Sequence, residues 1–315
     1  MDLIMSFSVH SFSVSAGRLG LAVLLACSSI SAQSLTPSHP GFKAPVPTRQ
    51  FMTPEQADIL SHMSVVYLDD GQGGTVKTLD ISGINVRIHN GSGTTGGPVD
   101  GLGNLIVGYN ELANPGNPNG DDRTGSHNIV TGIQNSFSSY GGLVGGQSNT
   151  VSSPWSSVSG GYGNIASGLY SSVSGGSENT ASGAFSSVSG GDSNTANAPL
   201  SSVSGGSLDT ASSPYASVSG GSLNTASGQW SSVSGGALNI AYGASAAVSG
   251  GQQNEANAAV SSVSGGRYNE TSAYWASVSG GIDNTANGTY SSVSGGEFNT
   301  ASGPRSSVSG GFYNV

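Results

Sequence analysis

The sequence predicts an all-β protein, a parallel β-solenoid with a small α+β region at its N-terminal side. Two observations predict this fold. A 15-residue motif recurs without a slip through the second half of the chain. In addition, 51 of the 315 residues are Gly and only 8% are charged, against about 25% in ordinary globular domains. Such a composition suits a repeat fold that is held by backbone ladders.

The repeat is defined by Ser-Val-Ser-Gly-Gly and is strictly periodic. Its valine stands at 11 positions spaced by 15 residues, namely Val158, Val173, Val188, Val203, Val218, Val233, Val248, Val263, Val278, Val293 and Val308. Earlier copies are degenerate: Leu143 to Asn149 are taken as in register, and Ile129 to Asn135 as one residue out. Register held over so many copies is a specific signature of a solenoid.

A 15-residue unit cannot hold a helix pair or bury a core of its own, so it fits one coil. We expect Ser-Val-Ser and Thr-Ala-Ser to form two short strands, with Val and Ala pointing inward. Gly-Gly and Ser-Gly would turn the corners, where a positive φ or a missing Cβ is needed. About 13 coils at ~4.8 Å each would make a rod roughly 60 Å long.

An Asn column follows the glycines and permits two interpretations. The amides either stack and close the turn, or they help to coordinate calcium, which needs a carboxylate in every coil. The column is neutral apart from Asp209, so the structural interpretation is favoured and no metal site is expected. The predicted ladder comprises Asn149, Asn164, Asn179, Asn194, Asn224, Asn239, Asn254, Asn269, Asn284 and Asn299.

An aromatic column precedes each Ser-Ser-Val. It contains Trp155, Tyr170, Phe185, Tyr215, Trp230, Trp275 and Tyr290. These rings could form a stacking surface for glycans, or they could pack at a corner or between chains. Leu200, Ser245, Val260 and Arg305 interrupt the column, and this favours packing over a uniform ligand array.

The first 52 residues predict export. Residues 1–32 resemble a secretory signal, with an apolar run after Arg18 and small residues before a cleavage site at Ala32. Cys27 permits a second interpretation, in which the cysteine is lipidated and tethers the chain to a membrane. Residues 33–52 hold four prolines and predict an extended linker. A secreted or cell-surface location, such as the outer membrane, is expected in either case.

Residues 53–125 predict a short helix and a β lead-in to the solenoid, which is assigned to residues 126–315. Thr53, Pro54 and Gln56 form a capping box that starts a helix reaching about Met63. Alternating apolar residues predict strands on either side of Gly83, over 75–82 and 84–88, and a further strand over 104–108.

The motif Ser156-Ser157-Val158-Ser159-Gly160-Gly161 resembles the head repeats of trimeric autotransporter adhesins, the YadA-like or haemagglutinin-repeat family. The resemblance covers residues 126–315. It implies a left-handed parallel β-roll, three chains packed side by side, and adhesion to extracellular matrix, glycans or another surface. Gly160 and its equivalents stand where the family has Ile. That difference predicts a thin core and therefore a stronger need for assembly as a homotrimer.

Composition and residue placement argue against other function classes. A net charge of −9 disfavours nucleic-acid binding, and nothing indicates a cofactor. Acids between 141 and 315 are scattered and are taken not to share a column, so no catalytic residues are expected. A cluster of Asp121, Asp122, Arg123 and His127 near Glu111 is interpreted as a loop that caps the first coil.

The chain is therefore expected to be an exported, non-catalytic adhesin or structural fibre. An ice- or mineral-binding protein that uses its Ser and Thr ladders is the alternative. A carbohydrate-active enzyme is the third class.

Overall fold

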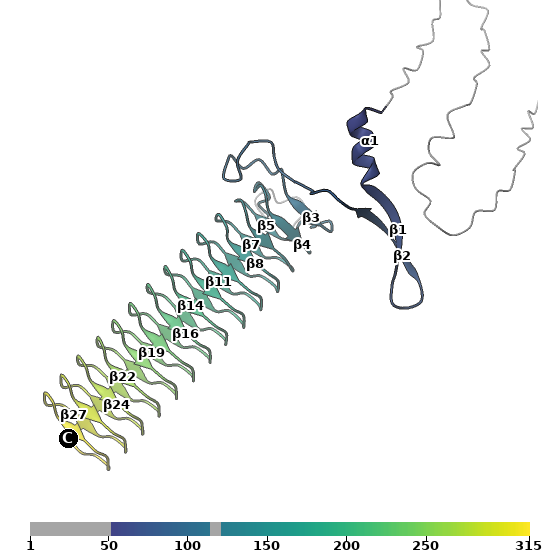
Figure 1. Cartoon of the computed structure of the whole chain (residues 1–315). Helices are drawn as coiled ribbons and strands as arrows, with labels where there is room; N and C mark the ends of the chain where they lie inside the picture. Colours follow the sequence, from purple (N-terminus) through teal and green to yellow (C-terminus); the bar gives the residue numbers. More distant parts are fainter. Residues whose placement is uncertain (1–51, 114–120) are drawn as a thin grey trace, which may run out of the picture. The chain divides into compact units, whose positions relative to one another are not determined.

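A computed structural model of the chain describes residues 52–113 and 121–315. The chain divides into two compact units between Arg87 and Ile88, and each is described here by itself. The predicted signal peptide, the linker and Cys27 lie outside the described residues. Figure 1 shows the helix and hairpin of the first unit and the stacked coils of the second.

The first unit is a short helix followed by a hairpin. In the predicted capping box, the Thr53 Oγ1 accepts from the Gln56 backbone N–H at 3.2 Å, and the Gln56 Oε1 accepts from the Thr53 N–H at 2.9 Å. The helix α1 (Pro54–Ser61) leads into β1 (Met63–Asp69), which pairs antiparallel with β2 (Thr75–Ile81). No residue between 52 and 87 is buried.

The strand predicted over 84–88 is wrong, and a strand at Met63–Asp69 was not foreseen. A strand exists only where a neighbour completes its hydrogen bonds. The neighbour of β2 is β1, and the turn between them brings the two strands together. In this turn the Asp70 Oδ1 accepts from the backbone N–H groups of Gln72 and Gly74, each at 2.8 Å. Residues 84–88 have alternating apolar side chains but belong to no strand of the structure.

The second unit is a β-solenoid of about 12 coils with about 15 residues per coil. From β5 onward, each coil contributes one two-residue strand to each of two parallel sheets. We call the 14-stranded sheet, which carries the valines, the Val sheet. Its strands are β3 (Leu105–Val107), β4 (Ile129–Thr131), β6 (Leu143–Val144), β8 (Ser157–Val158), β10 (Ser172–Val173), β12 (Ser187–Val188), β14 (Ser202–Val203), β16 (Ser217–Val218), β18 (Ser232–Val233), β20 (Ala247–Val248), β22 (Ser262–Val263), β24 (Ser277–Val278), β26 (Ser292–Val293) and β28 (Ser307–Val308).

The 12-stranded sheet carries the alanines, and we call it the Ala sheet. Its strands are β5 (Ser136–Phe137), β7 (Thr150–Val151), β9 (Ile165–Ala166), β11 (Thr180–Ala181), β13 (Thr195–Ala196), β15 (Thr210–Ala211), β17 (Thr225–Ala226), β19 (Ile240–Ala241), β21 (Glu255–Ala256), β23 (Glu270–Thr271), β25 (Thr285–Ala286) and β27 (Thr300–Ala301). Both sheets are labelled in Figure 1.

Equivalent residues of successive coils are direct neighbours. In the Val sheet, Ser172 pairs with Ser187 and Val173 with Val188. In the Ala sheet, Thr180 pairs with Thr195. The 15-residue period therefore confirms the predicted stacking of identical residues into columns, because a parallel in-register pairing places each side chain beside its own copy.

The inward columns of Val and Ala are confirmed, but the interior holds more than these two. The valines from Val158 to Val293 and the alanines from Ala166 to Ala301 are at most 1% exposed. An Asn column and a Ser column, such as Asn164 and Ser171, are buried with them. The core is thus filled by backbone-binding polar groups as well as methyl groups.

The proposed loss of an inward apolar group at Gly160 is wrong. A Cβ built on Gly160 would have no atom within 4 Å, so this position faces open space. The same holds for Gly175 and Gly250. An isoleucine there would not enter the interior, and the thin-core argument for assembly does not follow from this glycine.

The register proposed for the coil before the regular repeats is also corrected. Leu143 pairs with Ser157, and Val144 pairs with Val158. Val144 is therefore the inward residue, and Leu143 is 37% exposed. The reason is a corner one residue shorter: five positions separate Val144 from Asn149, and six separate Val158 from Asn164.

The Val sheet begins before residue 126, where the repeat was taken to start. The predicted strand over 104–108 is present as β3, and Leu105, Ile106 and Val107 pair in parallel with Ile129, Val130 and Thr131 of β4. The lead-in segment thus covers the first coil as a strand of the same sheet.

Candidate functional site

The buried Asn column closes one corner of each coil and ties it to the next. Asn239 shows the pattern: its Nδ2 donates to the Gly235 carbonyl oxygen at 2.9 Å and to the Gly251 carbonyl oxygen at 3.0 Å. Its Oδ1 accepts from the Asn254 backbone N–H at 3.0 Å. The Asn239 side chain is fully buried. Both polar atoms of the amide are engaged within the solenoid, so this column holds the coils together.

Asp209 replaces Asn once in this ladder and leaves it incomplete. Its Oδ1 accepts from the Asn224 backbone N–H at 2.8 Å, as an Asn would. Its Oδ2 takes the place of the amide nitrogen, is buried, and has no hydrogen-bond partner. Burial raises the pKa of Asp209 above its usual value, and the bonds from Asn224 only partly oppose this.

A buried Ser column lies at the opposite corner and was not singled out from the sequence. The Ser171 Oγ accepts from the Gly168 backbone N–H at 3.1 Å, and the Ser171 N–H donates to the Gly168 carbonyl oxygen at 3.0 Å. Ala216, Ala246 and Ala276 take the same place and are also buried. The recurrence of only small residues before each Ser-Val could have indicated this packing.

The aromatic column lies at that same corner and is half exposed. The exposed fraction of its rings runs from 44% at Trp155 and Tyr170 to 56% at Trp230. The rings of Trp155 and Tyr170 stack with centroids 4.8 Å apart, and those of Tyr170 and Phe185 stack at 4.9 Å. Tyr215 stacks on Trp230 at 5.7 Å, and Trp275 on Tyr290 at 6.2 Å. The rings pack on one another without entering the core.

Every residue of this column adopts a left-handed backbone conformation. The φ angle is 54° at Trp155, 59° at Val260 and 62° at Arg305. Non-Gly residues rarely adopt such angles, and a β-branched residue does so at a cost. Neither the aromatic residues nor Val260 signals this conformation, so the sequence did not predict it.

The prediction that the acids between 141 and 315 share no column is wrong. Glu255 and Glu270 pair directly in adjacent strands β21 and β23. The Asn257 Nδ2 donates to both carboxylates, at 3.0 Å to Glu255 Oε2 and 3.3 Å to Glu270 Oε1. Glu255 and Glu270 are spaced by exactly one coil, and this spacing could have predicted the pair from the sequence.

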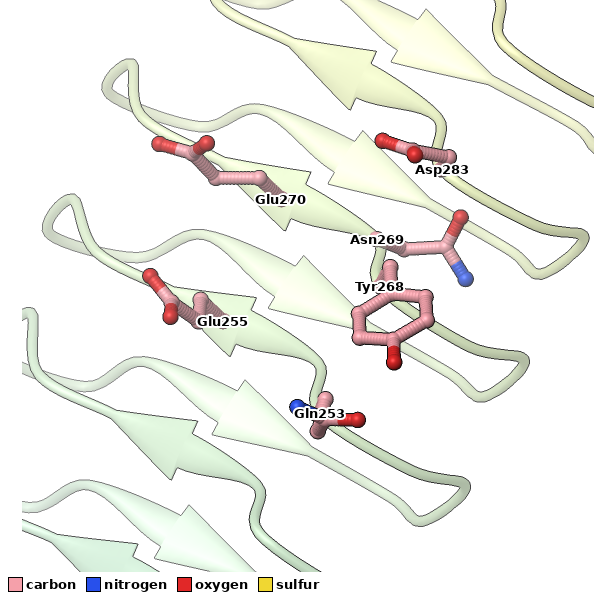
Figure 2. Close-up of a pocket in the computed structure, with 6 residues that line it drawn as sticks. All are labelled: Gln253, Glu255, Tyr268, Asn269, Glu270 and Asp283. Carbon is pink, nitrogen blue, oxygen red and sulfur yellow. The ribbon is translucent and has the colours of Figure 1, made fainter.

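These two glutamates line an open depression with a volume of about 360 Å³. Figure 2 shows them with the other residues that line it. Its lining residues are Gln253, Glu255, Tyr268, Asn269, Glu270 and Asp283. The Arg267 guanidinium lies 4.5 Å from the Tyr268 ring centroid, and it donates to the Tyr268 hydroxyl at 3.0 Å. Within residues 52–113 and 121–315, no group of three or more His, Cys, Asp or Glu is placed to hold a metal ion.

The acidic cluster ahead of the first coil is divided among structural contacts. The Arg123 Nη2 lies 3.4 Å from the Asp121 Oδ2 and donates to the Glu111 carbonyl oxygen at 2.9 Å. The Asp122 Oδ1 accepts from the Thr124 N–H and Oγ1 at 3.0 and 2.7 Å. The backbone carbonyls of Glu111 and Asp122 accept from the N–H groups of Gln134 and Phe137. This segment caps the first coil.

His127 is engaged elsewhere in the same cap. Its Nε2 accepts from the Asn90 backbone N–H at 3.2 Å, and its Nδ1 lies 3.2 Å from the Thr95 carbonyl oxygen. Because a backbone N–H can only donate, the Nδ1 carries the proton and donates to Thr95. Both ring nitrogens therefore hold the lead-in loop against the first coil.

Comparisons add no further assignment to this geometry. Among the helices of the described residues, none has the length and apolar character to cross a bilayer. No protein-family model matches the chain, and no curated protein matches its sequence.

Proposed function

We propose that this chain is an exported, non-catalytic adhesin or structural fibre that binds surfaces through many weak, identical contacts. The observation that carries the proposal is the in-register repetition of outward side chains. Thr180, Thr195, Thr210 and Thr225 follow one another on adjacent strands of the Ala sheet. Each is half-buried, with its side chain on the outer face.

Polyvalency is the physical reason why such a surface can bind strongly. Linked sites act at high effective concentration, so overall avidity can exceed the affinity of one contact by roughly 10²- to 10⁴-fold. The Val sheet offers a second set of columns, in which Ser172, Ser187 and Ser202 are direct neighbours. Straight columns distribute hydroxyl groups along the coils instead of gathering reactive groups at one point. This supports a binding role over an enzymatic one.

The proposal includes a location and an assembly. The apolar leader and small residues of 1–32 favour export to the bacterial cell surface, with tethering through Cys27 as the alternative to release. A homotrimer is the expected assembly from the resemblance to the YadA-like heads.

A graded substitution series tests the proposal. Thr195→Glu alone should reduce adhesion of surface-displayed protein to collagen or mucin coatings by about 2-fold. Thr195→Glu with Thr225→Glu and Thr300→Glu should reduce it by roughly 8-fold, because three 2-fold losses multiply along a polyvalent surface. Two coils already carry Glu255 and Glu270 in this column of the Ala sheet, so the fold accepts glutamate there. Equal adhesion across the series, or no adhesion of the original chain to either coating, would contradict the proposal.

Ice or mineral binding remains the second candidate, because the same Thr column forms a regular hydroxyl ladder. The column is interrupted at Ile240, Glu255 and Glu270, and charges on the face disfavour ordered water. Inhibition of ice recrystallisation at micromolar protein, lost in the triple Glu variant, would place this candidate first.

A further inference from the structure

The two edges of the solenoid differ sharply in charge. We define the aromatic edge as the aromatic column together with the residue before each of its members. We define the opposite edge as the two residues before each ladder Asn. Between 141 and 315, five of nine charged residues lie on the opposite edge, namely Glu178, Asp192, Arg267, Asp283 and Glu297. Glu255 and Glu270 lie on the Ala sheet, and Asp209 is buried.

The aromatic edge carries a single charge, Arg305, in its last coil. From Trp155 to Tyr290 it holds no charged residue over ten coils. Even the residues before the rings are mostly apolar, as in Leu169, Ala184 and Tyr274. An exposed apolar strip of this length on a chain of net charge −9 is typical of an interface.

We infer that the aromatic edge is the surface through which copies of this chain pack against one another. The inference names the interface of the assembly in the proposed function, and in that sense it rests on that proposal. The absence of charge is the first argument for a second copy. Two acidic chains can bring these edges together without burying an unpaired charge, whereas the opposite edges would bring like charges together.

The stacking of the rings is the second argument, because it selects the kind of partner. Trp155 and Tyr170 are 9° from parallel, and Tyr170 and Phe185 are 13° from parallel. Tyr170 therefore has a ring over each of its faces, and Trp155 and Phe185 each have one face covered by it. A sugar ring stacks on an exposed aromatic face, and in these stacks the facing sides of neighbouring rings are already occupied by each other. A second solenoid repeats at the same spacing as the coils, so its own edge can match this one ring by ring along its length.

The available area is sufficient for such an interface. Seven half-exposed rings of ~200 Å² each leave roughly 700 Å² exposed, before the neighbouring apolar residues are added. A standard stable interface buries about 800 Å² on each partner. The edge of one copy thus approaches the required area without any contribution from the faces of the sheets.

Matched triple variants test the inference by light scattering on the whole mature chain. The edge triple is Trp230→Ser, Trp275→Ser and Tyr290→Ser, and Ser245 shows that the column accepts serine. The control triple is Leu208→Ser, Leu223→Ser and Leu238→Ser on the opposite edge, where the leucines are 40–50% exposed. Ser193 occupies the equivalent position one coil before Leu208, so this column also accepts serine. Circular dichroism of each variant verifies that the solenoid is retained.

The original chain and the control triple should give the same oligomer mass at micromolar concentration. The edge triple should be monomeric, with an assembly constant weakened by at least 100-fold. A monomeric original chain, or an edge triple that stays assembled, would overturn the inference. An edge triple that stays assembled but loses mucin adhesion would identify the rings as a ligand surface instead. Adhesion by a monomeric chain would leave the proposed function standing without this interface.

Discussion

The two corners of each coil make the same reversal by different means. Both carry the chain between the Val sheet and the Ala sheet, and both need a positive φ. At the corner that we call the Gly–Asn corner, a glycine such as Gly236 takes a φ of 87°, Leu238 takes a φ of 59°, and the buried Asn239 closes the turn. At the aromatic corner, a bulky half-exposed residue such as Trp230 takes a φ of 57°.

The difference explains which columns vary and which do not. The second glycine of the Gly–Asn corner is Gly in every coil, because a Cβ there would overlap the backbone of the next coil. The aromatic corner accepts Trp, Leu, Ser, Val and Arg, because its side chains point outward. Strict repetition therefore marks contacts between coils, and variation marks the outer surface. Three substitutions test this comparison, from the largest expected effect to the smallest.

Gly236→Ala should destabilise the solenoid strongly. The new Cβ would overlap the Gly251 carbonyl oxygen, and alanine would have to keep a positive φ. We expect a loss of at least ~3 kcal/mol in local stability, measured by hydrogen exchange of the surrounding coils.

Gly235→Ala is the matched control, one residue earlier in the same corner. A Cβ there meets nothing nearer than the Gly220 carbonyl oxygen at 4.0 Å. Its effect should stay within about 1 kcal/mol. Equal losses for the two variants would show that the glycines serve flexibility and not the packing of coil on coil.

Asp209→Asn should stabilise the solenoid at neutral pH by roughly 2 kcal/mol. The amide restores the two donors that every neighbouring ladder residue supplies, and it removes a buried carboxylate oxygen with no partner. The thermal midpoint should rise. Asn239→Asp is the reciprocal control. It should lower the thermal midpoint by a similar amount, because the carbonyl oxygens of Gly235 and Gly251 would lose their donor.

The gain from Asp209→Asn should depend on pH in a defined direction. Because the folded chain raises the pKa of Asp209, the folded state holds its proton more tightly than the unfolded state, where the pKa is near 3.8. The cost of Asp209 is therefore absent below about pH 4 and grows as pH rises toward its raised folded pKa. Asp192, one coil earlier and exposed, is the nearest other charge along the chain and has the same sign. A gain that is constant from pH 3 to 8 would contradict this account.

The period and the inward residues could be predicted because a solenoid repeats one set of neighbours. Once Val173 must pair with Val188, every other column follows from the 15-residue spacing. The capping box of α1 was predictable for a related reason, since its contacts are local in sequence. The burial of the Asn ladder was predictable from its near-invariance.

The features that were missed depend on backbone conformation at single residues. The five-position corner after Val144 moves Leu143 outward, and no residue type in it announces a missing position. Gly160 resembles an inward position by its place in the motif, yet the chain has already turned outward there. The left-handed aromatic residues oppose local preference, and the stacking of coils overrides it.

Val260→Asn should give the smallest effect, a gain of about 1 kcal/mol. Valine is β-branched and holds a φ of 59° at the aromatic corner, whereas asparagine tolerates that conformation. Val260→Thr separates conformation from polarity, because threonine is polar but also β-branched and should give no gain. Both variants are best compared in the edge triple, where self-association would not contribute to the thermal midpoint. If both stabilise equally, the corner is limited by exposure of the side chain and not by its backbone. The aromatic residues would then carry no conformational cost for an interface to offset.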